Sequence, residues 1–165
     1  MSIELVEQEH RNPLEVVEGL AIRNAWPFER TTEEELTILV RGTWTDQQVS
    51  FMWMPSIEAL HLACAFEFKV PTHCQTEVLK LISMINQDMW TGHFDHWVDD
   101  GLIMYRNSLT LAGGLTACAQ QCEVMLGTGL AACERYFPAF QFVVWAGKPA
   151  REALDVAMFE TAGKA

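Results

Sequence analysis

The chain has 165 residues, of which half are hydrophobic and a fifth are charged, and its formal net charge is −11 at pH 7. This composition excludes intrinsic disorder, and a chain of this length is expected to fold as one globular domain without disulfides or metals. Its 11 basic residues are scattered, which argues against nucleic acids and anionic membranes as partners, because both are bound by clustered lysine and arginine.

The N-terminus predicts a short tail followed by a helix. Residues 1–11 are expected to form a flexible acidic tail, and residues 12–165 a single domain. Asn12-Pro13-Leu14-Glu15 is a typical helix start, because asparagine caps the helix, proline suits its first turn and glutamate lies three residues beyond the cap. Apolar residues at helical spacing continue to Asn24, and Trp26-Pro27 ends the helix.

Neither a secretory signal nor a membrane span is expected, because the first residues lack an apolar core and no run of 18 apolar residues occurs. We therefore expect a cytoplasmic protein with reduced thiols at its five cysteines. These are residues 64, 74, 118, 122 and 133.

Alternating apolar residues predict three strands before the second helix, over residues 36–41, 49–53 and 60–70. The turns between them are short, so consecutive strands are expected to be antiparallel neighbours. The third strand is the longest, with apolar residues at every second position.

The second half of the chain predicts helices around a β-hairpin. Pro71 opens a helix whose apolar stripe consists of Val78, Leu79, Ile82 and Ile85. Residues 93–98 and 102–111 are expected to form a hairpin across Asp99-Asp100-Gly101. A helix is expected over residues 115–137 with an interruption at Gly127 and Gly129, and a last helix begins at Pro149. Periodicity alone also permits a strand over residues 140–145.

This order of elements predicts an α+β fold with two layers, in which helices pack on one face of an antiparallel sheet. The core is expected to bring one side of the third strand against the first two helices. Its members are Leu62, Phe66 and Phe68 from the sheet and Leu14, Val17 and Ile82 from the helices.

One short motif is compatible with nucleotide binding. Gly127-Thr128-Gly129-Leu130-Ala131-Ala132 matches the G-x-G-x-x-A pattern of dinucleotide sites, in which glycines let the backbone approach a pyrophosphate. Too little chain follows this motif for the further βαβ units of such a domain. The alternative interpretation is a helix whose small residues let it cross the sheet closely.

Two clusters contain potential metal ligands. His93, Asp95 and His96 suit zinc, but on a strand the first two face one way and His96 the other, and no fourth ligand is evident. We therefore expect no specific metal, and an interface or edge-strand role for the histidines. Cys118 and Cys122 share a helix face and can join Cys133 or His73 around a soft metal, although such cysteines are more often core residues.

The sequence contains no arrangement typical of covalent catalysis. No serine lies in a G-x-S-x-G elbow, and the adjacent His73 and Cys74 do not by themselves form a nucleophile and base pair. We expect no catalytic residue and no cofactor.

Three segments resemble the YbjN-domain family of bacterial sensory transduction regulators. They are Asn12-Pro13-Leu14-Glu15 leading to Trp26-Pro27-Phe28, then Trp90 to Asp95, and then Glu134 to Phe142 with its Tyr-Phe-Pro-Ala-Phe-Gln-Phe run. The resemblance spans residues 12–160 by the order of elements. It implies a fold similar to type III secretion chaperones, commonly dimeric, with residues 140–145 in a C-terminal helix and no catalytic residues.

The combined expectation is a non-enzymatic, protein-binding regulator or chaperone-like adaptor of the bacterial cytosol. We expect a homodimer whose apolar contact uses the 90–111 hairpin or the C-terminal helices, since residues 1–35 are strongly acidic. The alternative is a small-molecule sensor with an aromatic-lined pocket between helices and sheet. A nucleotide-dependent enzyme that uses Gly127-Thr128-Gly129 is a third possibility.

Overall fold

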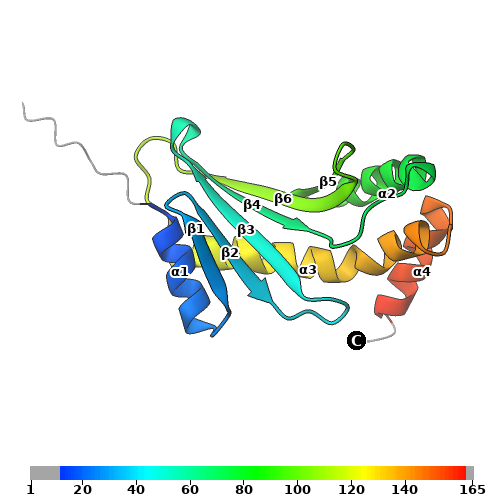
Figure 1. The fold of residues 1–165 in the computed structure, drawn as a ribbon, viewed down its shortest axis with the longest axis horizontal. Helices are drawn as coiled ribbons and strands as arrows, with labels where there is room; N and C mark the ends of the chain where they lie inside the picture. Colours follow the sequence, from blue (N-terminus) through cyan, green and yellow to red (C-terminus); the bar gives the residue numbers. More distant parts are fainter. Residues whose placement is uncertain (1–11, 163–165) are drawn as a thin grey trace, which may run out of the picture.

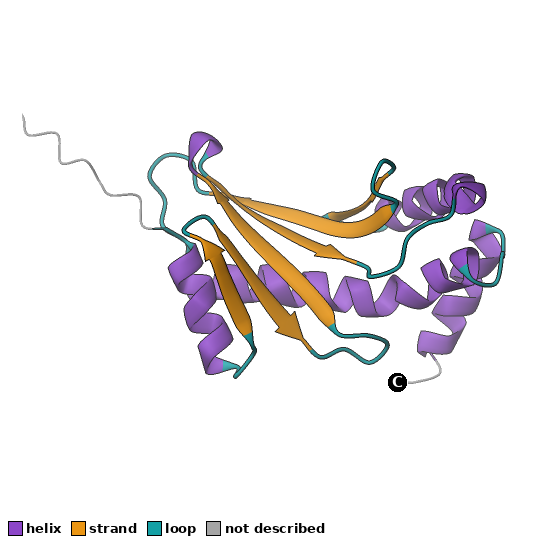
Figure 2. Cartoon of the chain, viewed as in Figure 1, coloured by secondary structure: helices purple, strands orange, loops and turns teal. Residues whose placement is uncertain are grey.

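The computed structural model describes residues 12–162, which form an open six-stranded antiparallel sheet and four α-helices (Figures 1 and 2). The predicted tail, residues 1–11, lies outside the described residues. The strands are β1 (Phe28–Thr32), β2 (Glu35–Val40), β3 (Gln47–Met54), β4 (Ala59–Ala65), β5 (His93–Trp97) and β6 (Leu102–Thr110). The helices are α1 (Leu14–Arg23), α2 (Gln75–Gln87), α3 (Ala119–Val144) and α4 (Ala150–Ala162). The sheet order is β1-β2-β3-β4-β6-β5.

The first helix begins where its sequence predicts. The N–H of Leu14 donates to Oδ1 of Asn12 at 3.0 Å, which satisfies one of the unpaired donors at the start of α1. The helix ends at Arg23, and the chain then turns at Ala25, whose φ of 54° lies in the left-handed region. Pro27 follows, and from there the chain enters the sheet.

The strand β1 was not predicted, and its composition explains why. It is the edge strand of the sheet, and most of its residues are exposed, so it shows no apolar alternation. Its place is fixed by backbone pairing with β2, in which Phe28 lies opposite Ile38. The predicted second and third elements, β2 and β3, are confirmed with small changes at their ends.

The predicted strand over residues 60–70 is wrong in its second half, because β4 ends at Ala65. Beyond that point the N–H of Val70 donates to the Gly101 carbonyl at the β5–β6 turn, at 2.8 Å. The apolar alternation nevertheless continues, because the rings of Phe66 and Phe68 both pack against Phe137 of α3. After Ala65, burial at every second residue therefore results from contact with α3 and does not indicate a strand.

The second helix is rotated slightly from its predicted phase. Its buried residues are Val78, Leu81, Ile82 and Ile85. Leu79, which the sequence placed on the apolar stripe, is 47% exposed, and Leu81 is fully buried in its place. Leu79 is thus an apolar residue on the outside of α2.

The third helix runs unbroken over 26 residues, so the predicted interruption at Gly127 and Gly129 is wrong. It also begins later than expected, at Ala119, where the N–H of Cys118 donates to Oε1 of Gln121 at 2.9 Å. Residues 140–144 are helical, as the family resemblance implied, and not a strand.

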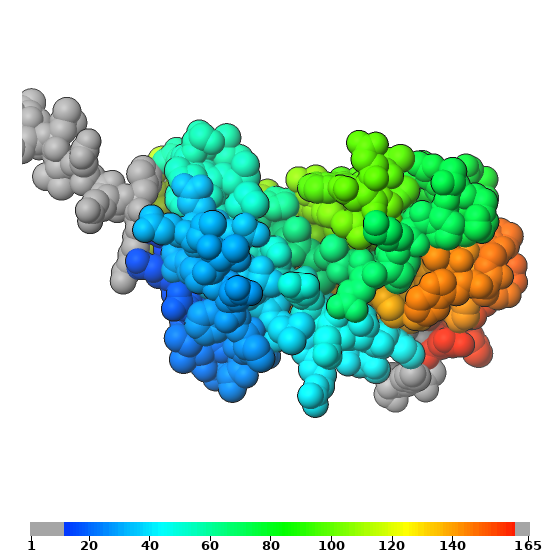
Figure 3. All heavy atoms as spheres, viewed as in Figure 1, coloured from blue at the N-terminus to red at the C-terminus, as the bar shows by residue number. Residues whose placement is uncertain are grey.

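The helices α1 and α3 cover one face of the sheet, and α2 and α4 pack together near the β5 end (Figure 1). In the same view with all atoms drawn as spheres, the strands lie in front and hide most of α3 (Figure 3). The predicted two-layer α+β fold is therefore confirmed. Of the six expected core residues, five are buried, and Phe68 is partly buried against them. Within residues 12–162, no helix is both long and apolar enough to cross a bilayer.

Candidate functional site

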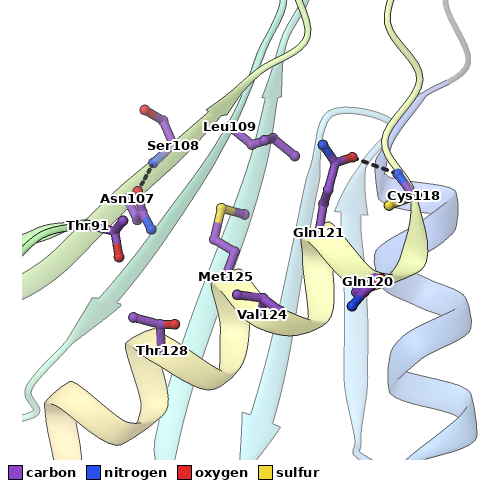
Figure 4. Close-up of a pocket in the computed structure, with 10 residues that line it drawn as sticks. All are labelled: Thr91, Asn107, Ser108, Leu109, Cys118, Gln120, Gln121, Val124, Met125 and Thr128. Carbon is purple, nitrogen blue, oxygen red and sulfur yellow. Dashed lines mark hydrogen bonds between the residues drawn. The ribbon is translucent and has the colours of Figure 1, made fainter.

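A groove of about 440 Å³ lies between β6 and the N-terminal half of α3, and we call it the β6–α3 groove (Figure 4). Its principal lining residues are Thr91, Asn107, Ser108, Leu109, Gln121, Val124, Met125 and Thr128. Figure 4 shows Val124 and Met125 on one turn of α3 and Thr128 on the next, with Asn107, Ser108 and Leu109 along the facing strand.

The groove exists because β5 is shorter than β6. The first residue of β5, His93, lies opposite Arg106, and the pairing of the two strands runs from there to the turn. The strand β6 continues to Thr110, so residues 107–110 have β4 on one side and no β5 residue on the other. A strand edge of this kind exposes backbone donors and acceptors that another extended chain can use.

The direction of the backbone groups on this edge follows from the ladder with β4. The N–H of Leu111 donates to the Glu58 carbonyl at 2.7 Å, and the N–H of Phe66 donates to the Ile103 carbonyl at 2.9 Å. Because backbone groups alternate sides along a strand, those of Ser108 and Thr110 point away from β4. The N–H of Ser108 is held by Oδ1 of Asn107 at 2.8 Å.

The walls of the groove are mainly apolar. Leu109, Val124 and Met125 supply hydrocarbon and thioether surface, and none of the lining residues carries a formal charge. Val124 is 60% exposed, which is unusual for a valine. Residues of this type beside a strand edge are suited to binding an extended, uncharged peptide segment.

The approach of α3 to the sheet is set by Gly129. A Cβ at this position would lie 2.9 Å from Cε1 of Tyr105 and 3.5 Å from Cδ2 of Leu62. The helix therefore needs a glycine to pass the sheet here, and the groove opens on the N-terminal side of this contact. Residues 124–126 are helical, so no strand precedes Gly127, and the dinucleotide interpretation is wrong.

The histidine cluster is split between the two faces of the sheet, as expected for a strand. Asp95 lies on the open face, where its Oδ2 is 3.4 Å from Nη1 of Arg106, and Arg106 also donates to Nε2 of His61 at 3.2 Å. His96 pairs with the buried Ile103, and neither of its ring nitrogens has a hydrogen-bond partner. Burial lowers the pKa of His96.

The cysteines do not gather into a ligand set. Cys118 is exposed at the start of α3, whereas Cys122 is buried one turn later, and burial raises the pKa of the Cys122 thiol to about 11. In the part of the chain that the structure describes, no three histidine, cysteine or acidic residues lie close enough to hold a metal ion. A thiol with a raised pKa is a poor nucleophile and a poor ligand.

The sequence did not identify the β6–α3 groove, although it contained a signal. The predicted hairpin has strands of unequal length, residues 93–98 and 102–111, so one end of the second strand had to lack a partner. The position of α3 beside that end depends on the contact at Gly129, which the sequence alone does not specify.

Comparisons with known proteins agree with this architecture. The model of the YbjN family, described as "Putative bacterial sensory transduction regulator", matches residues 13–142. A search of the curated proteins finds no relative.

Two solved structures share the fold. A chain in the crystal structure of the ExsC–ExsE complex is 16% identical, with a TM-score of 0.55 over 74% of this chain and 88% of that one. YbjN from E. coli, described as "a putative transcription regulator", is 11% identical, with a TM-score of 0.52 over 73% of this chain and 85% of that one. The fold is similar to that of type III secretion chaperones, as the resemblance implied. The residues matched and the shared fold together show that the chain belongs to the YbjN family.

Proposed function

We propose that this protein is a non-enzymatic regulator of the bacterial cytosol that binds a partner protein through the β6–α3 groove. The single domain of residues 12–165 acts without a metal or cofactor. In this proposal an extended segment of the partner adds a strand to β6 and places its apolar side chains against α3.

The observation that carries the proposal is the edge of β6 at residues 107–110, which has no β5 partner and lies beside an apolar face of α3. Ser108 and Thr110 direct backbone groups toward the groove. The N–H of Ser108 donates to Oδ1 of Asn107, and rotation of that side chain would free the N–H for a bound peptide. The apolar side chains of Leu109, Val124 and Met125 then favour apolar residues in the bound segment. The solved complex of ExsC with ExsE, which has a similar fold, supports a protein as the ligand.

Val124→Asp is expected to weaken partner binding by about tenfold or more, because it places a carboxylate among the apolar contacts. The partner is first isolated by crosslinking from a photoreactive residue at Val124, and its crosslinked segment is then titrated as a synthetic peptide. Leu115→Asp is the matched control, because Leu115 is equally exposed but does not line the groove. The proposal fails if both substitutions weaken binding equally, or if neither does.

We also propose that the protein is a homodimer formed through the 90–111 hairpin. Trp90 is fully exposed, and Trp97 and Val98 of the same hairpin are also exposed. Aromatic residues without cover are typical of interfaces, and homodimers mostly pair one patch with itself about a two-fold axis. Light scattering at micromolar concentration is expected to give twice the chain mass in low and high salt, and Trp90→Asp to give a monomer. A monomer mass for the unaltered chain in both salts would contradict the dimer.

A further inference from the structure

A second cavity, separate from the β6–α3 groove, is lined mainly by aromatic rings, and we call it the aromatic cleft. Its volume is about 300 Å³, and it lies between the β2–β3 loop, the segment after β4 and the C-terminal end of α3. Figure 1 shows this loop beside that part of α3. The lining residues are Trp44, Thr45, Glu67, Phe68, Phe137, Gln141 and Trp145.

One wall of the cleft is held in place by Glu134 of α3. Its Oε1 accepts hydrogen bonds from the N–H of Thr43 at 2.8 Å and from Nε2 of the buried Gln47 at 2.9 Å. Its backbone carbonyl accepts the indole N–H of Trp44 at 3.1 Å. Three hydrogen bonds to one residue fix the loop, so Trp44 keeps its position although it is partly exposed.

The opposite wall is a packed group of rings. The ring centroid of Phe68 lies 5.5 Å from that of Trp145 and 5.8 Å from that of Phe137. Phe137 is buried, whereas Trp145 is 64% exposed at the end of α3. Trp44 on one wall and Trp145 on the other are thus both exposed, and Phe68 and Phe137 pack beside Trp145.

The electrostatics of the cleft favour a cation. The faces of aromatic rings are negative and attract ammonium groups, and Glu67 is the one acidic or basic side chain in the lining. The helix α3 ends at Val144, so the negative end of its dipole lies at Gln141 and Trp145. The two lysines closest in sequence to the lining residues do not line the cleft. Lys148 pairs with Glu152 at 2.9 Å, and Lys69 lies beside Gly101.

We infer that the aromatic cleft binds a small quaternary ammonium compound. The methylated nitrogen would lie between Trp44 and Trp145, with Glu67 as its counter-ion, and Phe68 and Phe137 would contact the methyl groups. Quaternary ammonium fits this site better than a primary amine, because it is weakly hydrated and has no N–H that must be paired. This function goes beyond protein binding and does not depend on it.

The test compares choline with 3,3-dimethyl-1-butanol, in which a neutral carbon replaces the charged nitrogen. Each is titrated into the full chain by calorimetry, with tryptophan fluorescence as a second readout. We expect saturable binding of one choline per chain, with the neutral compound bound at least about fivefold more weakly. Binding of both compounds with equal affinity, or no saturable choline signal, would overturn the inference.

Three variants assign the binding to the cleft. Glu67→Gln is expected to weaken choline about fivefold and leave the neutral compound unchanged, whereas Trp145→Ala weakens both. Phe159→Ala is the control, because Phe159 is an exposed aromatic residue that does not line the cleft. Thermal melting checks that each variant is folded, and Trp145→Phe, which keeps an aromatic ring, is expected to retain most of the affinity. Choline binding that survives both Glu67→Gln and Trp145→Ala would place the site elsewhere.

Discussion

Replacing Phe66 with alanine is expected to lower the free energy of unfolding by about 3–5 kcal/mol, as for other large-to-small core changes. Phe66 is 5% exposed, and its ring is surrounded by those of Phe94, Phe137 and Phe140 at centroid distances of 5.1 to 6.0 Å. It joins the sheet, the end of α3 and the segment after β4. Three elements therefore lose packing when its ring is removed.

Denaturant unfolding measures this loss, and Phe159→Ala is the matched control. Phe159 lies on α4 and is 83% exposed, so its replacement is expected to change the free energy of unfolding by less than about 0.5 kcal/mol. A change that small for Phe66→Ala would mean that the aromatic cluster does not form the core.

Alanine at Gly127 and alanine at Gly129 are expected to change stability in opposite directions. At Gly127 an added Cβ meets nothing within 4 Å, so Gly127→Ala should stabilise α3 by about 0.5–1 kcal/mol through helix propensity. At Gly129 the Cβ would lie 2.9 Å from the buried Tyr105 ring. Overpacking of this kind costs about 1–3 kcal/mol, so Gly129→Ala should be destabilising overall.

The two variants differ by one added methyl on the same helix, two residues apart, so their difference isolates the contact with the sheet. Both variants gain the same helix propensity, so we expect them to differ by the overpacking cost alone, about 1–3 kcal/mol in denaturant unfolding. Equal stabilities would show that α3 does not pass Tyr105 closely. The groove N-terminal to that contact would then lose its structural basis.

The fold could be predicted from the sequence wherever burial on one face creates a clear period. The strands β2 and β3 follow such a pattern, whereas the start of α1 and the β5–β6 hairpin were indicated by capping and turn residues. Where the period had another cause, prediction failed. Phe66 and Phe68 alternate with polar residues because both rings contact Phe137, and β1 has no buried face, so neither segment could be assigned correctly from spacing.

The glycines of α3 illustrate the limit of local rules. Glycine disfavours helix, so Gly127 and Gly129 predicted an interruption. Tertiary contact decides the outcome instead, because the sheet leaves no room for a side chain at Gly129. The sequence allowed an aromatic-lined pocket as an alternative, but the residues of neither candidate site could be named from it, for a related reason. Each site is formed by segments far apart in the chain, such as those of Trp44 and Trp145, and no short sequence motif predicts that such segments lie together.

The partly buried His96, whose two ring nitrogens have no hydrogen-bond partner, is expected to make the fold sensitive to acid. Burial lowers the pKa of His96 and also that of His61, where Arg106 adds to the effect. Below about pH 6.5 the unfolded chain binds protons that these folded histidines do not take up, so stability is lost as the pH falls through their folded pKa values. Glu77 acts at lower pH. Its Oε2 accepts the N–H of Ala150 at 2.8 Å, and this bond lowers its pKa, so the stability it contributes is lost below about pH 4.5. Denaturant unfolding at a series of pH values is therefore expected to show a first loss of stability below about pH 6.5 and a second below about pH 4.5.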